Sequence, residues 1–425
     1  MQQPAAADSG AEPAVGRARE KLWAICGSTV LVMAGQGITS PVLPLFAREF
    51  GATASQVGMT LSAFGLARLV LNIPLGLLAD RRGRRALLIG GPLATTVGMV
   101  GSALAPNIAV LLLWRFVAGA GSAGYMTGAQ IYLTDISTPA TRARYLATNQ
   151  AALLTGVSIG PGVGGLLADL WGLRAPFLVV GATAVLATVY SYVRLPETRD
   201  PLAAASADAL TGAGRAAARK VDRAHLRAFA RSPGFLAVSF ITLSVFATRT
   251  GGRGVLVVLR GTDEFDLTPK DLGLLFTLTS LLGLVLVGPA GWIADRFGRT
   301  VAIAPPTLVA AVGVAMIGLP GLSSFVAGNV IMAVGTSISG PAPAAYVADL
   351  APSQLRGVVM GMYRTVGDVG FVVGPPLLGA ISDRAGAPAA LYANAALLVV
   401  AAIAFLVLVR RQHAPQTDTV AGAAV

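Results

Sequence analysis

Residues Leu66–Arg85 read LARLVLNIPLGLLADRRGRR, an apolar run that ends in an acid and a cluster of arginines. Its last ten residues, Gly76–Arg85, have a second copy at Gly291–Thr300, which reads GWIADRFGRT. The two copies begin 215 residues apart, about half of the 425-residue chain. A repeat of this length indicates two copies of one large unit rather than a solenoid, whose period is roughly 20–50 residues.

The composition around this repeat is that of an integral membrane protein. Hydrophobic residues make up 54% of the chain and charged residues only 12%, with a mean hydropathy of +0.70, whereas soluble domains carry about 25% charged residues. Many charge-poor runs have the length of roughly 20 residues that spans a bilayer. The net charge of +12 does not indicate nucleic-acid binding, because the basic residues lie between apolar runs rather than on one face.

We predict an all-α integral membrane protein with twelve transmembrane helices, six in each of two pseudo-symmetric halves. The expected organisation is a disordered cytoplasmic tail at 1–20, an N-terminal half at 21–195, a cytoplasmic linker at 196–233, a C-terminal half at 234–411 and a cytoplasmic tail at 412–425. The expected spans are 22–47, 56–79, 86–105, 108–133, 147–170, 175–193, 235–259, 272–293, 301–319, 323–347, 357–381 and 388–409.

The charges between the spans predict the orientation. With both termini in the cytoplasm, the inner segments hold 22 basic residues and the outer loops hold 5, which is the bias of a multi-pass protein of the bacterial inner membrane. No cleaved signal peptide is expected. The linker stretch 213–230 is either an amphipathic basic helix on the membrane surface or a solvated connection.

Other markers support the duplication. Asp135 and Asp349 lie 214 residues apart, as do Asp169 and Asp383. Two parallel six-helix halves place a transport path between them, near the bilayer midplane. A single cysteine excludes a disulfide framework and a cysteine-based metal site. We expect no metal and no cofactor beyond a proton gradient, a small-molecule substrate, the lipid bilayer as environment and a monomeric state.

The membrane region resembles the major facilitator superfamily. Gly76–Arg85 is similar to that superfamily's motif between helices 2 and 3, and Gly291–Arg299 is its second copy. The resemblance implies a conformational latch in which an acid faces a helix N-terminus of the other half and arginines pair with acids nearby; the other reading is an anchor for topology only. The latch residues would be Gly76, Asp80, Arg81, Gly83, Arg84, Arg85, Asp135, Asp295, Arg296, Gly298, Arg299 and Asp349.

A second motif resembles that of twelve-helix drug:proton antiporters. Residues 156–165 read GVSIGPGVGG in the predicted fifth helix. The glycines would let this helix approach a neighbour closely and bend, since small residues allow packing in lipid. The motif indicates either an exporter or plain helix packing. Its residues are Gly156, Gly160, Pro161, Gly164 and Gly165.

Ionisable residues within a span are candidate functional residues. Asp368 is the only acid expected well inside the hydrocarbon, and it follows Arg364 by four residues, so the two could pair on one helix face. Asp368 could exchange its arginine partner for a proton, or the pair could be static. Arg115 is the resemblance's other candidate for proton coupling.

Polar residues in other spans are candidates for lining the substrate cavity. Arg68 could instead bind helix carbonyls, and Arg249 and Arg253 could snorkel to the interface. The first span has no acid, which favours neutral or anionic cargo over cations. The cavity candidates are Arg68, Gln36, Asn72, Gln130, Gln150, Tyr363, Arg249 and Arg253.

The sequence favours secondary active transport, most specifically proton-coupled efflux of small amphipathic or drug-like molecules by alternating access. A metabolite or sugar symporter or uniporter of the same superfamily is the alternative. A membrane enzyme would need a cluster of catalytic groups at membrane depth, and the spans contain no histidine and only one acid, Asp368, well inside the hydrocarbon. A non-transporting sensor would need a large soluble output domain, which the short segments between spans do not supply.

Overall fold

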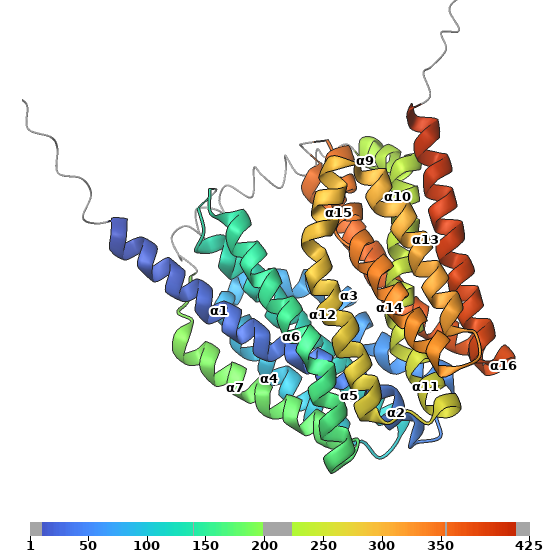
Figure 1. The fold of residues 1–425 in the computed structure, drawn as a ribbon. Helices are drawn as coiled ribbons and strands as arrows, with labels where there is room; N and C mark the ends of the chain where they lie inside the picture. The colour runs from blue at the N-terminus through green and yellow to red at the C-terminus, as the bar shows by residue number, and fades with distance from the viewer. Residues whose placement is uncertain (1–10, 139, 199–222, 353–354, 414–425) are drawn as a thin grey trace, which may run out of the picture.

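The computed structural model describes residues 11–138, 140–198, 223–352 and 355–413, which form a bundle of long helices without strands (Figure 1). In this part of the chain, eleven helical segments are long and apolar enough to cross a membrane. The last segment is interrupted at Gly386, where φ is 84°. This bend divides it into two spans, and the segments thereby supply the twelve predicted helices.

The N-terminal half differs from prediction only at its start. The first helix begins at Ala11, inside the stretch expected to be a disordered tail, and it ends at Thr39; a short second helix then completes the predicted first span. Residues 1–10 lie outside the described residues. The helices are α1 (Ala11–Thr39), α2 (Leu43–Arg48), α3 (Ala54–Arg82), α4 (Arg84–Ala103), α5 (Ile108–Asp135), α6 (Arg142–Trp171) and α7 (Ala175–Arg194).

The C-terminal half contains a π-helix that the sequence does not predict. It is η1, and it interrupts the first span of this half. The helix α9 covers the end of the predicted amphipathic stretch, whereas 199–222 lie outside the described residues, as do 414–425. The elements are α9 (Arg223–Ala230), α10 (Pro233–Ala247), η1 (Thr248–Val257), α11 (Val258–Phe265), α12 (Pro269–Arg296), α13 (Arg299–Ile317), α14 (Leu322–Ser339), α15 (Ala342–Leu350) and α16 (Arg356–His413).

The duplication is visible in local backbone geometry. Gly83 and Gly298, 215 residues apart, have φ values of 92° and 87°, a region that side chains with a Cβ rarely adopt. Both separate consecutive helices. Thr53 and Thr268, also 215 residues apart, form capping boxes at the start of α3 and α12. The same sequence spacing therefore produces the same turns and caps in both halves.

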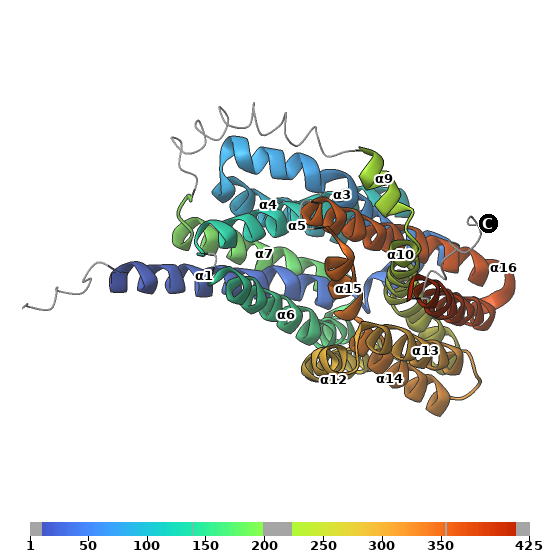
Figure 2. The ribbon, with the colours of Figure 1, turned by 90° about the horizontal axis from the view of Figure 1, so that it is seen from above.

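The halves meet along two helix pairs, α3 with α16 and α6 with α12, and Figure 2 shows the second pair side by side. We call the end of the bundle with the two arginine-rich loops the Asp80 end, and the other the Asp383 end. At the Asp383 end, Asp383 of α16 accepts hydrogen bonds from the backbone N–H groups of Ala54 and Ser55 at 2.7 and 3.0 Å. Arg48 also pairs there with Asp263 at 3.1 Å. Polar contacts between the halves are therefore concentrated toward the Asp383 end.

Candidate substrate cavity and charged residues

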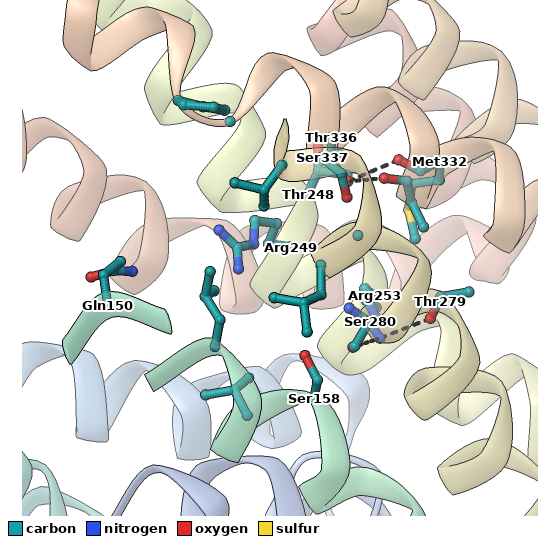
Figure 3. A pocket seen from close by; sticks show the side chains of 18 residues that line it. Gln150, Ser158, Thr248, Arg249, Arg253, Thr279, Ser280, Met332, Thr336 and Ser337 are labelled. Atoms are coloured by element: carbon teal, nitrogen blue, oxygen red, sulfur yellow. Dashed lines mark hydrogen bonds between the residues drawn. The ribbon is translucent and has the colours of Figure 1, made fainter. Parts of the chain in front are cut away.

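A cavity of ≈ 380 Å³ lies where α6, η1, α12 and α14 meet. Its wall combines hydroxyl and amide groups with aliphatic side chains and two arginines, Arg249 and Arg253, and contains no acidic residue. The volume falls within the range of small-molecule sites, about 300–1,000 Å³. The predicted cavity residues Gln150, Arg249 and Arg253 all line it (Figure 3).

Arg253 is held firmly by the wall of the cavity. Its Nη2 donates to the carbonyl of Phe276 at 2.9 Å and to the hydroxyls of Thr279 and Ser280, both at 3.0 Å. The guanidinium also lies over the Phe276 ring, with 4.5 Å to the centroid. These contacts fix its position and leave it no acidic partner among the described residues.

Arg249 is arranged differently. Its guanidinium carbon lies 5.8 Å from the centroid of the Phe246 ring, and among the described residues it has no hydrogen-bond or acidic partner. Figure 3 shows its side chain extending into the cavity, away from Thr279 and Ser280. The prediction that Arg249 and Arg253 snorkel to the interface is therefore wrong, because both guanidinium groups line the interior cavity.

Asp368 is paired across the two halves. Its Oδ1 lies 4.0 Å from Nη2 of Arg68 on α3, and the described structure contains no ion pair between it and Arg364. Arg364 instead donates to Oε1 of Gln130 on α5 at 3.4 Å. The predicted pair within one helix is thus replaced by two contacts between halves, because the helix face that carries both residues points toward α3 and α5.

A chain of contacts links this ion pair with the cavity. The Arg68 guanidinium lies 6.0 Å from the centroid of the Phe371 ring, and the carbonyl of Phe371 accepts from the hydroxyl of Thr250 at 3.5 Å. Thr250 directly follows Arg249 in η1. A movement of α16 relative to α3 would therefore reach the cavity wall.

Arg115, the second predicted coupling residue, lies on α5 in the N-terminal half. It is 6% exposed, its guanidinium lies 4.9 Å from the centroid of the Phe64 ring, and its Nη1 lies 3.9 Å from the sulfur of Met99. No acid pairs with it among the described residues. Its role in coupling stays a prediction.

Three further cavity candidates lie elsewhere. Gln36 donates to the Ser122 hydroxyl at 3.3 Å, and the phenol oxygen of Tyr363 accepts from Thr242 at 3.1 Å. Asn72 is half-buried on α3. None of the three belongs to the wall of the cavity that contains Arg249.

The predicted pairing of loop arginines with Asp135 and Asp349 is made by one arginine in each half, and the role of these pairs as a latch stays a prediction. Arg84 lies 2.8 Å from Asp135 and 3.8 Å from Asp80. Its equivalent Arg299 lies 3.2 Å from Asp349 and 3.0 Å from Asp295. Each arginine thus joins the acid of its loop motif to an acid in the last turn of another helix, α5 in the first half and α15 in the second.

The other latch residues have separate contacts. Arg85 donates to the carbonyl of Tyr192 at 2.7 Å, and Arg296 lies over the Trp292 ring with 5.8 Å to the centroid. Asp80 is largely exposed, and its described ion pair is with Arg84 in the same half. The contact of Asp80 with a helix of the other half, implied by the resemblance, is not found among the described residues. Gly76 lies in open space, and Arg81 lies in the last turn of α3.

The glycines of the helix-5 motif make close helix contacts on two sides. A Cβ on Gly156 would meet the Val30 carbonyl at 2.8 Å, and one on Gly160 would meet Gly37 Cα at 2.5 Å. Gly164 packs in the same way on Ile38, so these three glycines bring α6 against α1. Gly165 faces Pro269 and Gly273 of α12, as the Pro161 carbonyl does. The prediction of close packing is confirmed, and its second side is an interface between halves.

Among the described residues, no group of three His, Cys, Asp or Glu side chains could hold a metal ion.

The sequence profile of the Major Facilitator Superfamily matches residues 25–259 and 241–424. The chain belongs to this superfamily. As a Major Facilitator Superfamily member it is a transporter, a multi-pass membrane protein that moves small molecules, and not an enzyme.

Relatives within the superfamily cover most of the chain. Multidrug resistance protein 2 of Bacillus subtilis is 25% identical over 82% of this chain and 85% of its own length. Quinolone resistance protein NorA of Staphylococcus aureus is 25% identical over 83% of this chain and 87% of its own. A solved bacterial homologue of the human lysosomal transporter Spinster, described as inward-facing and unoccupied, has a TM-score of 0.76 at 17% identity, covering 93% of this chain and 97% of that one. This last likeness concerns the fold.

Several cavity residues were missed by sequence reasoning. Ser158, Thr248, Thr279, Ser280 and Ser337 all line the cavity. Hydroxyl side chains in spanning helices usually bind a carbonyl of their own helix, as Thr279 does with Leu275 at 2.8 Å. The available signal was the doublet of neighbouring hydroxyls at 279–280 and again at 336–337.

Proposed function

We propose that this transporter exports small amphipathic molecules from the cytoplasm in exchange for protons, by alternating access. The observation that carries the proposal is the ion pair between Asp368 and Arg68, because it joins a protonatable group to a contact between the two halves. Protonation removes the charge of the carboxylate and weakens this attraction. A proton can thus bias which conformation is populated.

The distribution of contacts supports an inward-facing conformation. The excess of basic residues supports an orientation in the bacterial inner membrane in which the Asp80 end and both termini are cytoplasmic. The Asp383 end, where the halves are joined by hydrogen bonds and by the Arg48–Asp263 pair, then faces outward and is closed. The Spinster homologue with the same fold is also described as inward-facing.

The names of the relatives support export as the direction. One is called a multidrug resistance protein and the other a quinolone resistance protein, and resistance follows when a drug leaves the cell. The cavity, with polar groups on an aliphatic wall, has the chemistry expected for an amphipathic molecule. A fluorescent quinolone is therefore the first cargo to test.

The test uses purified protein in proteoliposomes loaded with the quinolone norfloxacin. An imposed proton gradient, with the acidic solution on the side opposite the drug, should accelerate the release of the drug. A protonophore should return this release to the rate of drug-loaded liposomes without protein. Release that the protein accelerates equally with and without the gradient would contradict proton coupling. If the gradient instead drives the drug to accumulate inside the liposomes, on the side that the protons enter, the protein is a symporter, the alternative that the same fold permits.

A further inference from the structure

The central cavity carries positive charge that the described protein does not neutralise. Arg249 and Arg253 both contribute to its wall, and no lining residue is an acid. A charged side chain at membrane depth is costly unless a counter-charge or water accompanies it. An anion that enters this cavity would find two guanidinium groups without carboxylate partners.

The two arginines differ in their contacts, and we assign Arg253 a structural role and Arg249 a binding role. Nη2 of Arg253 is directed to Phe276, Thr279 and Ser280, so this residue braces η1 against α12. Arg249, one helical turn earlier, has no hydrogen-bond or acidic partner among the described residues, and its side chain extends into the cavity (Figure 3). A free guanidinium presents paired donors that match a carboxylate or phosphonate geometrically.

The backbone around Arg249 explains its position. It lies in η1, and single π-helical turns within α-helices occur frequently at functional sites. Gly251 faces the carbonyl of Gly374 on α16, where a Cβ would approach within 2.9 Å. The glycines of η1 therefore let its backbone lie close to α16, while the arginine occupies the opposite, open side.

The remainder of the cavity suits an apolar body. Leu154 and Val157 contribute from α6, and Leu284 and Val287 from α12. Gln150 and Ser337 offer additional polar groups at the edges. The cavity wall thus combines the guanidinium of Arg249 with an aliphatic surface.

We propose that Arg249 is the anion-binding residue of the transport site and that the cargo is an amphipathic organic anion, held by its carboxylate-like group at Arg249 and by its apolar part along α6 and α12. This inference rests on the proposed function, because it takes the central cavity as the transport site. It adds the chemical class of the cargo and the residue that selects it.

The test measures equilibrium binding by calorimetry to the full chain in nanodiscs, without a gradient. The probes are 2-naphthoate, 2-naphthylmethanol and 2-naphthylmethylammonium, which share one aromatic body and differ in charge. We expect naphthoate to bind about tenfold more tightly than the alcohol, because a hydrogen bond to an ionised group is stronger than one to a neutral group, and to bind more tightly than the amine by a larger factor.

The variant Arg249→Gln should abolish this preference, and Arg249→Lys should retain part of it. Arg144→Gln, which removes an exposed cation at the Asp80 end, is the matched control and should bind naphthoate as the wild type does. Equal binding of the three probes, a preference for the amine, absence of binding, or an unchanged preference in Arg249→Gln would each overturn the proposal. Selective anion binding combined with gradient-independent release of norfloxacin would retain the anion site and reject proton-coupled export, so the two failures are distinguishable.

Discussion

Asp368 of α16 lies 4.0 Å from Arg68 of α3, so the one acid predicted within the hydrocarbon is paired with an arginine of the other half. The side chains are 20% and 32% exposed, which leaves the carboxylate accessible to a proton. Arg364, on the same helix, holds Gln130 of the other half at 3.4 Å. Two neighbouring contacts thus join α16 to the N-terminal half beside the cavity.

The first prediction concerns Asp368→Asn. This change keeps the size of the side chain and removes its titration. Drug release driven by a proton gradient should therefore fall to the level of drug-loaded liposomes without protein. Exchange of labelled for unlabelled drug, which needs no net proton movement, should persist. Both are measured in the same proteoliposomes, and wild-type gradient-driven release in this variant would remove Asp368 from the coupling mechanism.

A charge exchange separates coupling from a static ion pair. Arg68→Asp combined with Asp368→Arg restores opposite charges across the α3–α16 contact but moves the carboxylate to the other half. If the pair only stabilises this conformation, the double variant should recover the driven release that either single variant loses. If the position of the carboxylate matters, as we expect, the double variant should recover thermal stability but not driven release.

The second prediction concerns the Asp383 end. Asp383 caps the first turn of α3 by accepting from Ala54 and Ser55, an N-cap contact made by the other half of the protein. Loss of an N-cap typically costs about 1 kcal/mol, which corresponds to about fivefold in a conformational equilibrium. Asp383→Ala, which removes both acceptor oxygens, should therefore raise the population open at this end.

The measurement is labelling of a cysteine at Ser62, which lies between the halves with its hydroxyl bonded to the Val372 carbonyl, in a Cys26→Ser background. A water-soluble maleimide should react about fivefold faster in the Asp383→Ala variant. Asp169→Ala is the matched control, because Asp169 is the repeat equivalent, is exposed, and has no hydrogen bond in the described structure. Equal acceleration in both variants would attribute the effect to charge rather than to the cap.

The third prediction concerns Asp80, which is exposed here and pairs with Arg84 of its own half. If it meets a helix N-terminus of the other half only when the Asp80 end closes, Asp80→Asn leaves the affinity of the inward-facing cavity unchanged. Turnover should fall about two- to fivefold, because such a charge–dipole contact contributes about 0.3–1 kcal/mol. Calorimetry and drug release measure the two quantities; an unchanged turnover would leave the motif as a topology anchor.

The fold could be predicted from the sequence because bilayer thickness and repeat spacing constrain it strongly. Glycines at 83 and 298 and threonines at 53 and 268 recur at one spacing, and the structure gives each pair the same conformation. The π-helix at 248–257 was not predictable in this way. Its backbone pattern depends on packing against α16, and it has no counterpart in the periodicity of hydrophobic residues.

The site was predictable only in part, because residue type identifies a candidate and packing selects its partner. The spacing of Arg364 and Asp368 indicates a shared helix face, yet it does not show that this face lies against α3, where Arg68 is the nearer cation. Similarly, Arg249 and Arg253 have the same spacing, but hydroxyls from α12 satisfy only the second. Contacts between distant segments decided both outcomes.

The fourth prediction uses two glycines of α6 that face different partners. Gly160 packs on α1 within its own half, and a Cβ there would lie 2.6 Å from the backbone nitrogen of Ile38. Overpacking of this kind typically costs about 1–3 kcal/mol, so Gly160→Ala should lower the melting temperature in detergent. Gly165 instead faces Gly273 of α12, with a Cβ separation of 3.1 Å from its Cα.

Because α6 and α12 belong to different halves, Gly165→Ala should disfavour the conformation closed at the Asp383 end more than it disfavours folding. The cysteine at Ser62 should then react faster, while the melting temperature changes less than in Gly160→Ala. Gly90→Ala, in open space on α4, controls for the substitution itself and should change neither readout. Faster labelling in Gly160→Ala than in Gly165→Ala would contradict the assignment of the α6–α12 contact as the surface along which the halves separate.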